Sequence, residues 1–408
     1  MGSVTVPEMV STITRFSELN DHFTALAADP SKELDVDLLD HVDLQLNFGN
    51  IDYLVPVLLP RLAVILEGYT QNIDPLANFT TKIIQNLKIG QINEILGEEG
   101  AKSLDSLIVA ALLMNSPGGK KLGLALLTAC ARDGPLAVQQ KSQAPQLIES
   151  LIITWLRSPD AGVGSEATKT LLRLLHAHKE SPSPNVWDKI FSPDCQLQIY
   201  ANCVIQSRDD KPTRDQKTIS QGRLLEALPH IVQLNPAMPV RSLPNTDWSA
   251  LASTNDEPYP GLPDDGLLHL VVLHMVDLED DPMVVLLVRF WEQLVLCLDS
   301  LNMDPMTPVG EKYAKVLGIV ISKTSDDGKK ISEALVSLPG QLEQTQDQDR
   351  ISVGEGGDSG YEAGDEFDRN EVNMNGDDAP DDDFYCIHSR NSNGTSEANT
   401  LENWRLGC

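Results

Sequence analysis

Residues Met283 to Leu298 read MVVLLVRFWEQLVLCL. This stretch is apolar on nearly every side of a helix, and Arg289, Glu292 and Gln293 are the exceptions. A helix in a two-layer domain buries only one face, whereas a helix that is apolar all round needs neighbours on both sides. The stretch therefore predicts an inner helix in a stack of helices.

Earlier stretches repeat the apolar spacing of helices that bury one face. Their apolar residues fall at positions i, i+3, i+4, i+7 and i+8, or at most of these, and so share one side of a helix. The residues that carry this pattern are Leu104, Leu107, Ile108, Ala111 and Leu112; Ile148, Leu151, Ile152, Trp155 and Leu156; Ala167, Leu171, Leu174 and Leu175; and Leu224, Leu225, Leu228, Ile231 and Val232. No stretch of several residues alternates strictly between apolar and polar. The sequence therefore predicts an all-α fold.

Asp-Pro pairs mark three expected helix starts, at Asp74, Asp281 and Asp304. Asp can accept the free amide protons of a first helical turn as the N-cap, and Pro loses no hydrogen bond at the next position. Further breaks fall at 116–119, 134–135, 158–160 and 181–184. The breaks lie roughly 40–50 residues apart, the length of two helices and their turns in a HEAT or armadillo repeat. We therefore expect a HEAT/armadillo-like α-solenoid.

The composition divides the chain into four expected parts. Residues 1–234 form a first block of helical repeats, 235–265 a Pro-rich loop, and 266–338 a second block of helical repeats. Between 341 and 386 there are 15 acidic residues and 2 basic ones. A segment so charged and so poor in apolar residues cannot bury enough surface to offset the entropy of ordering. We therefore expect 339–408 to be a disordered acidic tail.

The net charge of the whole chain is −29, from 31 basic and 60 acidic residues. Such a field repels phosphate backbones and anionic lipid surfaces, so direct binding to nucleic acid or membranes is not expected. No apolar run reaches the roughly 18 residues of a membrane span, and the first residues lack the pattern of a secretory signal. Six scattered cysteines favour free thiols in a reducing compartment. The expected location is the cytoplasm, and the nucleus is the second possibility.

The residues that could carry chemistry have plainer interpretations. His176 and His178 point about 200° apart on a helix, so they do not converge on a metal ion. Cys195 and Cys203 lack the close pairing of a structural zinc site. The segment 117–121 lacks the first Gly and the final Ser or Thr of a phosphate-binding loop, so an interhelical turn is the better interpretation. The sequence therefore predicts no catalytic residue, no metal site and no cofactor.

A run of acids between two apolar helices is the candidate partner-binding site. A solvated turn explains these acids too, and Asp281 is also the expected N-cap of the second helix. Two charged residues that interrupt the apolar helix are added to the site. The nominated residues are Asp277, Glu279, Asp280, Asp281, Arg289 and Glu292.

Four segments carry a resemblance to a known family: Ile51–Tyr69, Arg214–Ile231, Gly266–Asp277 and Asp281–Val295. They resemble a fungal family labelled "DNA mismatch repair protein". Its best understood members are assembly chaperones of the proteasome regulatory particle base. The family is similar in kind to the mammalian proteasome non-ATPase regulatory subunit five. The resemblance covers about 10–320 and rests on packing patterns.

The resemblance implies a curved stack of HEAT-like helix pairs whose concave face holds the C-terminal domain of a regulatory ATPase subunit. The implied protein is a non-enzymatic chaperone, monomeric by itself, that occludes its partner until assembly is complete. Members of the family continue with further helical repeats where this chain becomes acidic, after about residue 320. Two alternatives stay open: a DNA mismatch repair-associated factor, and a HEAT-type transport or phosphatase adaptor that grips basic peptides.

Overall fold

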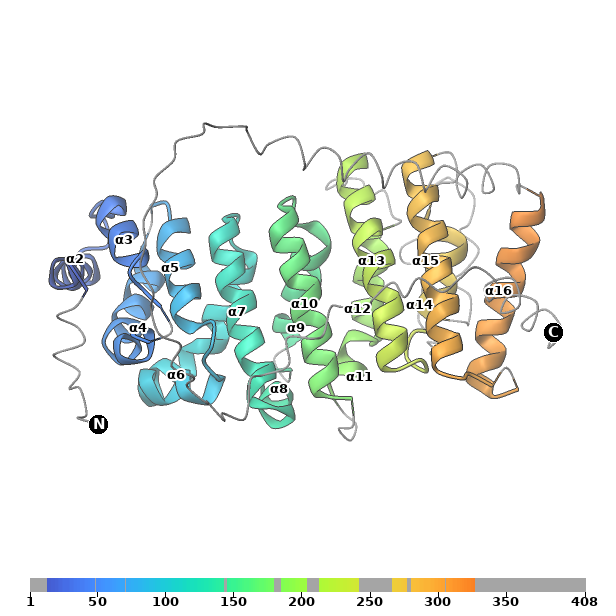
Figure 1. Cartoon of the computed structure of the whole chain (residues 1–408), viewed down its shortest axis with the longest axis horizontal. Coiled ribbons are helices and arrows are strands. Elements are labelled where there is room, and N and C mark those ends of the chain that lie inside the picture. Colours follow the sequence, from blue (N-terminus) through green and yellow to red (C-terminus); the bar gives the residue numbers. More distant parts are fainter. Residues whose placement is uncertain are drawn as a thin grey trace, which may run out of the picture. The chain divides into compact units, whose positions relative to one another are not determined.

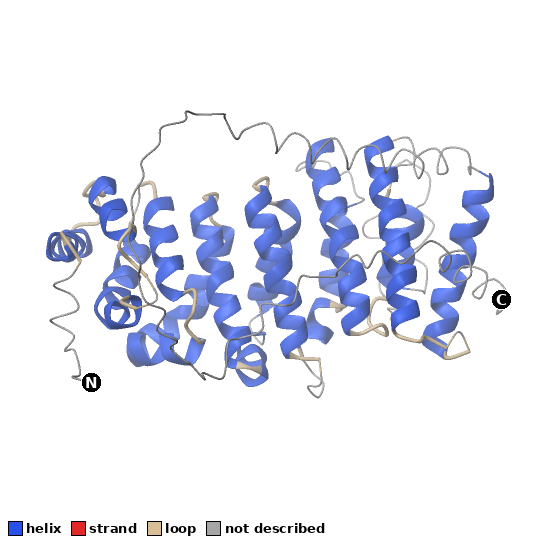
Figure 2. Cartoon of the chain, viewed as in Figure 1, coloured by secondary structure: helices blue, strands red, loops and turns tan. Residues whose placement is uncertain are grey.

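The computed structural model describes most of the chain up to residue 326. The described ranges are 13–47, 49–69, 71–142, 145–179, 185–203, 213–241, 266–276, 280–304 and 306–326. Within them helices make up 79% of the residues, and no strand is present (Figure 2). The all-α prediction is thus confirmed. The predicted tail, 339–408, lies outside the described residues, as does most of the predicted Pro-rich loop.

The elements carry the labels of Figure 1. In chain order they are α2 (Phe16–Ala28), α3 (Val36–Asp43), α4 (Ile51–Gly68), α5 (Asp74–Ile84), α6 (Ile89–Leu113), α7 (Pro117–Asp133), α8 (Pro135–Ser142), α9 (Pro145–Arg157), α10 (Ala161–Ala177), α11 (Val186–Ile190), α12 (Pro193–Cys203), α13 (Arg214–Leu234), α14 (Gly266–Leu270), the π-helical turn η2 (Val271–Met275), α15 (Asp281–Ser300) and α16 (Pro308–Asp326). None of these helices has both the length and the apolar character needed to cross a bilayer. One compact unit ends at Ser322, and the following paragraphs concern this unit.

The helices of this unit pack in two successions. Helices α5, α7, α10, α13 and α15 each contact the next one along the row (Figure 1). Helices α4, α6, α9 and α12 form a second succession in the same way. The two are joined pairwise, since α4 packs on α5, α6 on α7, α9 on α10 and α12 on α13. Each pair therefore buries its apolar faces against its own members and against the neighbouring pair.

The predicted apolar faces lie in the contacts between these helices. All the predicted residues of α9, α10 and α13 are buried, as are four of the five in α6. Leu107 is the exception and is only partly buried. Trp155 lies at the centre of the α9 face, 1% exposed, and its indole N–H donates to the Thr168 hydroxyl of α10 at 3.0 Å. Each fully buried large apolar side chain contributes about 1.5–3 kcal/mol, so these faces hold the pairs together.

The three Asp-Pro pairs do not supply N-caps as predicted. Asp74 is already the first residue of α5, and the residue before it, Ile73, occupies the N-cap position. The Asp74 carboxylate instead accepts hydrogen bonds from the Ser116 hydroxyl and from the Gly118 main-chain N–H at the start of α7. The prediction was wrong here because a neighbouring helix end competes for the same carboxylate.

At the other two pairs, the residue that caps the helix is a neighbour of the predicted Asp. Asp280 rather than Asp281 caps α15, and its carboxylate accepts from the Met283 N–H at 3.4 Å. Asp304 lies in the turn before α16, where it accepts from the Met306 N–H at 2.9 Å. The hydroxyl of Thr307 takes the capping role there, since it accepts from Gly310. An Asp before a Pro thus lies either in the turn, as Asp304 does, or in the first turn of the helix, as Asp74 and Asp281 do.

Hydrogen bonds between neighbouring helices recur at a similar sequence separation. The Thr154 hydroxyl of α9 donates to the Leu112 carbonyl at the end of α6, 42 residues earlier, at 2.8 Å. The hydroxyls of Thr128 in α7 and Thr170 in α10 lie 3.0 Å apart, also separated by 42 residues. The Asp74–Gly118 bond between α5 and α7 spans 44 residues. These bonds fix the register between helices that occupy corresponding positions in successive pairs.

The described part of the Pro-rich segment, 235–241, is anchored by the helices that follow it. The Tyr313 hydroxyl of α16 donates to the Pro236 carbonyl at 2.9 Å. Gly266, which begins α14, has φ +82°, and a Cβ there would lie 2.8 Å from the Pro239 carbonyl oxygen. Only glycine fits that close approach at positive φ. The segment therefore joins α13 to the helices after it within one compact unit.

Candidate partner-binding surface

Helix α15 carries three of the six nominated residues, and its solvent-facing side is mixed in character. Leu287, Val288, Leu294 and Leu298 are buried on the side that packs within the unit. The opposite arc is exposed and includes two large apolar side chains. We define the α15 surface as Leu286, Arg289, Glu292, Gln293 and Leu296, where Leu286 is 37% and Leu296 59% exposed.

The sequence predicts neighbours on both sides of α15, and the structure shows that this arc between them is open to water. Counting apolar residues suggested burial all round, yet Leu296 stands mostly in water. The polar exceptions in the sequence, Arg289, Glu292 and Gln293, all fall on the same arc. Because these three polar residues share one face of the helix, their spacing in the sequence indicates that this face is exposed.

The structure brings only part of the nominated set together. Arg289 and Glu292 are exposed on the α15 surface. Asp280 lies at the helix start, where its carboxylate is 3.4 Å from the Arg214 guanidinium of α13. Asp281 begins α15, and its side chain is not among those described. Asp277 and Glu279 lie outside the described residues.

Helix α13 flanks the α15 surface. A Cβ on Gly222 would meet Leu286 at 3.6 Å, and the Cys297 thiol lies 3.7 Å from the Pro229 carbonyl oxygen. Gly222 and Pro229 of α13 thus face Leu286 and Cys297 of α15. Burial lowers the pKa of His230 on α13, and the charge of Glu226 opposes this shift. The surface thus combines two exposed leucines with Arg289, Glu292 and Gln293.

The phosphate-loop-like segment forms the first turn of α7. Ser116 is the N-cap, and its hydroxyl accepts from the Gly119 N–H at 3.0 Å. The Gly118 N–H points to the Asp74 carboxylate at 2.6 Å. A helix N-terminus attracts anions, and here a carboxylate of the protein already takes that position. The segment is therefore not a phosphate-binding loop, but the prediction of an interhelical turn was wrong, because 117–121 belong to α7 and the turn ends at Ser116.

The thiols of the described region are buried or partly buried. Burial raises the pKa of Cys203 to about 12 and also raises the pKa of Cys195 and Cys297. A thiol must be deprotonated to act as a nucleophile or metal ligand, so these environments favour the inert form. Within the described ranges, no three His, Cys, Asp or Glu side chains are grouped so that they could hold a metal ion.

The two histidines at the end of α10 differ in environment. His176 is exposed, whereas His178 is fully buried at the C-cap. Burial lowers the pKa of His178, and the main chain of Pro135 opposes the shift. The imidazole of His178 is therefore neutral at pH 7 and does not act as a cationic partner of the helix dipole.

We expect the free energy of unfolding to fall as the pH drops below about 6.5. Below this pH the imidazole of residue 178 binds a proton in the unfolded chain, whereas burial disfavours its protonation in the folded chain. Acid therefore shifts the equilibrium toward unfolding. Urea unfolding between pH 5 and 8 measures the slope. His178→Asn should flatten it below about pH 6.5. A slope identical in both proteins would contradict this assignment.

Comparison of the sequence with models of protein families finds no match. No curated protein sequence matches it either. The fold and the α15 surface thus define the chain only as an all-α protein with an exposed mixed surface.

Proposed function

We propose that the compact unit is a HEAT-like α-solenoid that acts as a non-enzymatic scaffold for binding another protein. The pairwise packing of the helices supports the repeat architecture, as do the cross-helix hydrogen bonds that span 42 to 44 residues. That separation agrees with the spacing of breaks in the sequence. Stacks of such pairs present extended surfaces, which is how repeat proteins bind their partners.

The exposed leucines of the α15 surface carry the binding proposal. Leu286 and Leu296 bracket Arg289 and Gln293 along one arc of the helix. Large apolar side chains gain free energy when a partner removes them from water, and nearby charges select the partner. The residues that dominate such interfaces are commonly few and central, so Leu296 and Arg289 are the expected anchors.

For the partner, we propose a regulatory ATPase subunit of the proteasome, held through its C-terminal domain during assembly of the regulatory particle base. This rests on the resemblance of the segments that form α4, α13, α14 and α15. The scaffold would act by occluding its partner and stabilising it, since a ligand that binds only the folded state adds to its stability. The proposed protein is monomeric by itself and works in the cytoplasm or nucleus without cofactor or direct nucleic-acid contact.

Affinity purification with mass spectrometry, from cells that are assembling proteasomes, tests this function. The wild-type chain should recover regulatory ATPase subunits. Arg289→Glu with Leu296→Glu should reduce their recovery about tenfold, as loss of anchor residues does. The matched control is Leu136→Glu on α8, an equally drastic change at a side chain that is 75% exposed.

Three results would contradict the proposal. The wild-type chain could recover no ATPase subunit, or could recover transport cargo or phosphatase subunits instead. Salt-dependent shifts of DNA in a gel would favour the DNA-repair alternative. Equal recovery by the α15 variant and the wild type would leave the ATPase partner in place and remove the α15 surface as its binding site.

A further inference from the structure

Helix α4 turns an unusually apolar side toward water. Tyr53 is 37% and Val64 55% exposed, and Pro56 and Pro60 lie between them on the same side. Helices that pack on one face normally turn polar residues outward. We call Tyr53, Pro56, Pro60 and Val64 the α4 surface. Their spacing of three to four residues gives a continuous strip about 16 Å long at 1.5 Å per residue.

The two prolines add hydrogen-bond acceptors to this strip. Proline has no N–H, so Pro56 and Pro60 remove the helical donors for the carbonyls of Asp52 and Pro56. Both of these residues are exposed. Backbone carbonyls seek a donor, and here an incoming N–H or cationic side chain can provide one. The α4 surface is thus apolar along its length and rich in acceptors toward its first turn.

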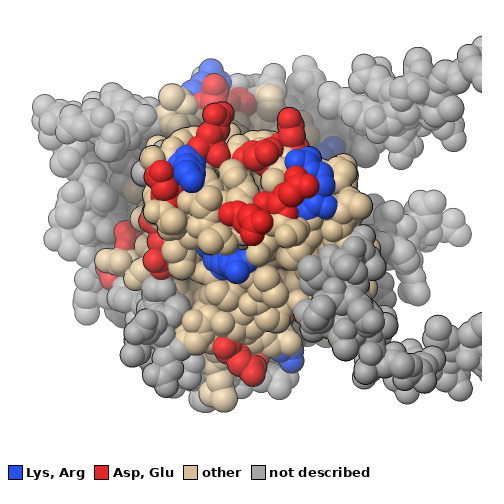
Figure 3. All heavy atoms as spheres, turned by 90° about the vertical axis from the view of Figure 1, so that its left-hand side faces the viewer, with Lys and Arg blue, Asp and Glu red and all other residues tan. Residues whose placement is uncertain are grey.

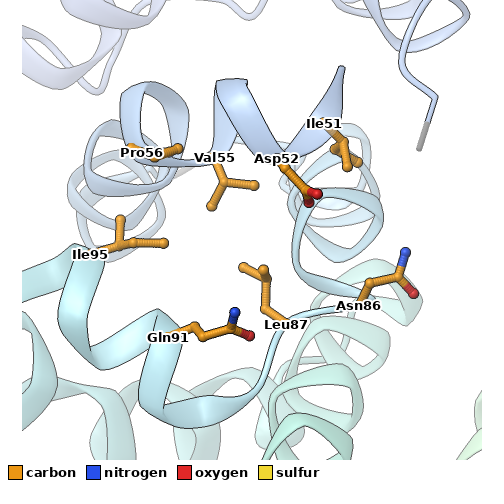
Figure 4. Close-up of a pocket in the computed structure, with 8 residues that line it drawn as sticks. All are labelled: Ile51, Asp52, Val55, Pro56, Asn86, Leu87, Gln91 and Ile95. Carbon is orange, nitrogen blue, oxygen red and sulfur yellow. The ribbon is translucent and has the colours of Figure 1, made fainter. Parts of the chain in front are cut away.

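A pocket of about 600 Å³ opens beside the α4 surface, between α4 and α6. Val55 of α4 and Leu87 point toward each other across it, and Ile95 of α6 closes another side (Figure 4). This volume falls in the usual range for ligand sites, about 300–1,000 Å³. Pro56 borders the pocket and also belongs to the α4 surface, so the strip and the pocket form one continuous site.

The edge of the pocket is polar, and among the described residues that line it the one charged side chain, Asp52, is negative. Asp52, Asn86 and Gln91 line that edge (Figure 4). The carbonyl oxygen of the Gln91 side chain accepts from the Lys88 N–H at 2.9 Å, which fixes this side chain at the start of α6. The carboxylate of Asp52 is exposed. An apolar interior with a carboxylate at its edge suits a ligand in which an apolar group lies next to a positively charged group.

The neighbouring end of the unit is acidic. Helix α2 packs on α4 and α3 packs on α2, and Figure 3 shows acidic side chains prevailing over basic ones on this face. The exposed acids of α2, α3 and the segment between them are Glu18, Asp21, Asp29, Glu33, Asp35, Asp37 and Asp40, against the bases Arg15 and Lys32. Such a field attracts a cationic partner and speeds its encounter.

We propose that the α4 surface and its pocket dock a basic amphipathic helix of a partner protein. The apolar face of that helix lies along Tyr53 and Val64, and one large apolar side chain enters the pocket. Lysines or arginines at the edge of the helix meet Asp52 and the acidic end. The strip accommodates about three helical turns, so the anchors fall at i, i+3 or i+4, and i+7. The site is separate from the α15 surface.

Fluorescence anisotropy on the full chain tests this with a labelled helical peptide of leucine and lysine, its leucines on one face. We expect Val64→Gln and Asp52→Lys each to weaken binding about tenfold. High salt should also weaken it, because the charges contribute. Leu136→Gln on α8, at another exposed leucine, should leave the affinity within about twofold. Both α4 positions are exposed, so circular dichroism should show intact helices in each variant.

Two further experiments identify what binds to the α4 surface. A peptide of the same composition with its leucines scattered around the helix should bind at least about tenfold more weakly. Equal binding of both peptides, or no loss in the α4 variants, would overturn the proposal. Analytical sedimentation gives a third outcome. If the wild-type chain sediments as a dimer and the Val64→Gln variant as a monomer, a second copy occupies the surface and the proposal is overturned.

Discussion

Replacing Gly118 with alanine is expected to lower the free energy of unfolding by about 2–3 kcal/mol. Gly118 lies in the first turn of α7, where α5 approaches closely. A Cβ at this position would lie 2.6 Å from Asp74 Oδ1 and 2.9 Å from both the Asp74 Cα and its carbonyl oxygen. Main-chain atoms cannot move aside as the end of a side chain can, so the two helices must separate. Their separation also breaks the hydrogen bond that the Gly118 N–H donates to the Asp74 carboxylate.

Gly222→Ala provides the matched control for this prediction. Gly222 also lies inside a helix, but the nearest atom to its added Cβ is Leu286 Cδ1 at 3.6 Å, an ordinary contact. Alanine is the better helix former, so this variant should gain about 0.5–1 kcal/mol. Urea unfolding followed by circular dichroism compares the two. A Gly118→Ala protein as stable as the wild type would show that α5 and α7 are less tightly joined than described.

The second large effect is expected where α13 crosses the junction of α9 and α10. The Arg223 guanidinium donates to the Trp155 carbonyl at 2.7 Å and to the Asp160 carbonyl at 3.1 Å. The helical donor for Trp155 would come from residue 159, which is Pro159 and has no N–H. Arg223→Ala thus leaves a buried acceptor unsatisfied and should cost about 1–3 kcal/mol.

The contact between Arg223 and Gly164 can be tested with a double-mutant cycle. An added Cβ on Gly164 would overlap the Arg223 guanidinium directly. Gly164→Ala should therefore destabilise the wild type by about 1–3 kcal/mol but leave Arg223→Ala almost unchanged, since the obstructing group is gone. Thermal and urea unfolding of all four proteins give the coupling. Additive effects would contradict the arrangement of Arg223 over Gly164.

The sequence predicted best where a single face decides burial. The apolar residues of α9, α10 and α13 recur with the period of a helix, and every one of those predicted is buried. Helix α15 was harder, because apolar content alone does not reveal how many neighbours a helix has. Arg289, Glu292 and Gln293 together marked the open arc, yet each was interpreted as a separate interruption.

The details that failed depend on contacts far apart in the chain. An Asp before a Pro favours a helix start, but only the approach of α7 draws the carboxylate of Asp74 away from its own helix. Likewise, nothing local to Trp155 indicates that Arg223, 68 residues later, supplies its missing donor. The apolar strip on α4 was also missed, since exposed and buried apolar residues look alike in one sequence.

The recurring bonds between successive helix pairs have a mechanical consequence. Each pair is tied to the pairs beside it, as by the Thr154–Leu112 and Thr128–Thr170 bonds, so a local opening disturbs only adjacent joints. Hydrogen exchange should then spread inward from the outermost helices, in steps of one pair. A partner clamped near one end would slow that fraying there and leave the far end unaffected.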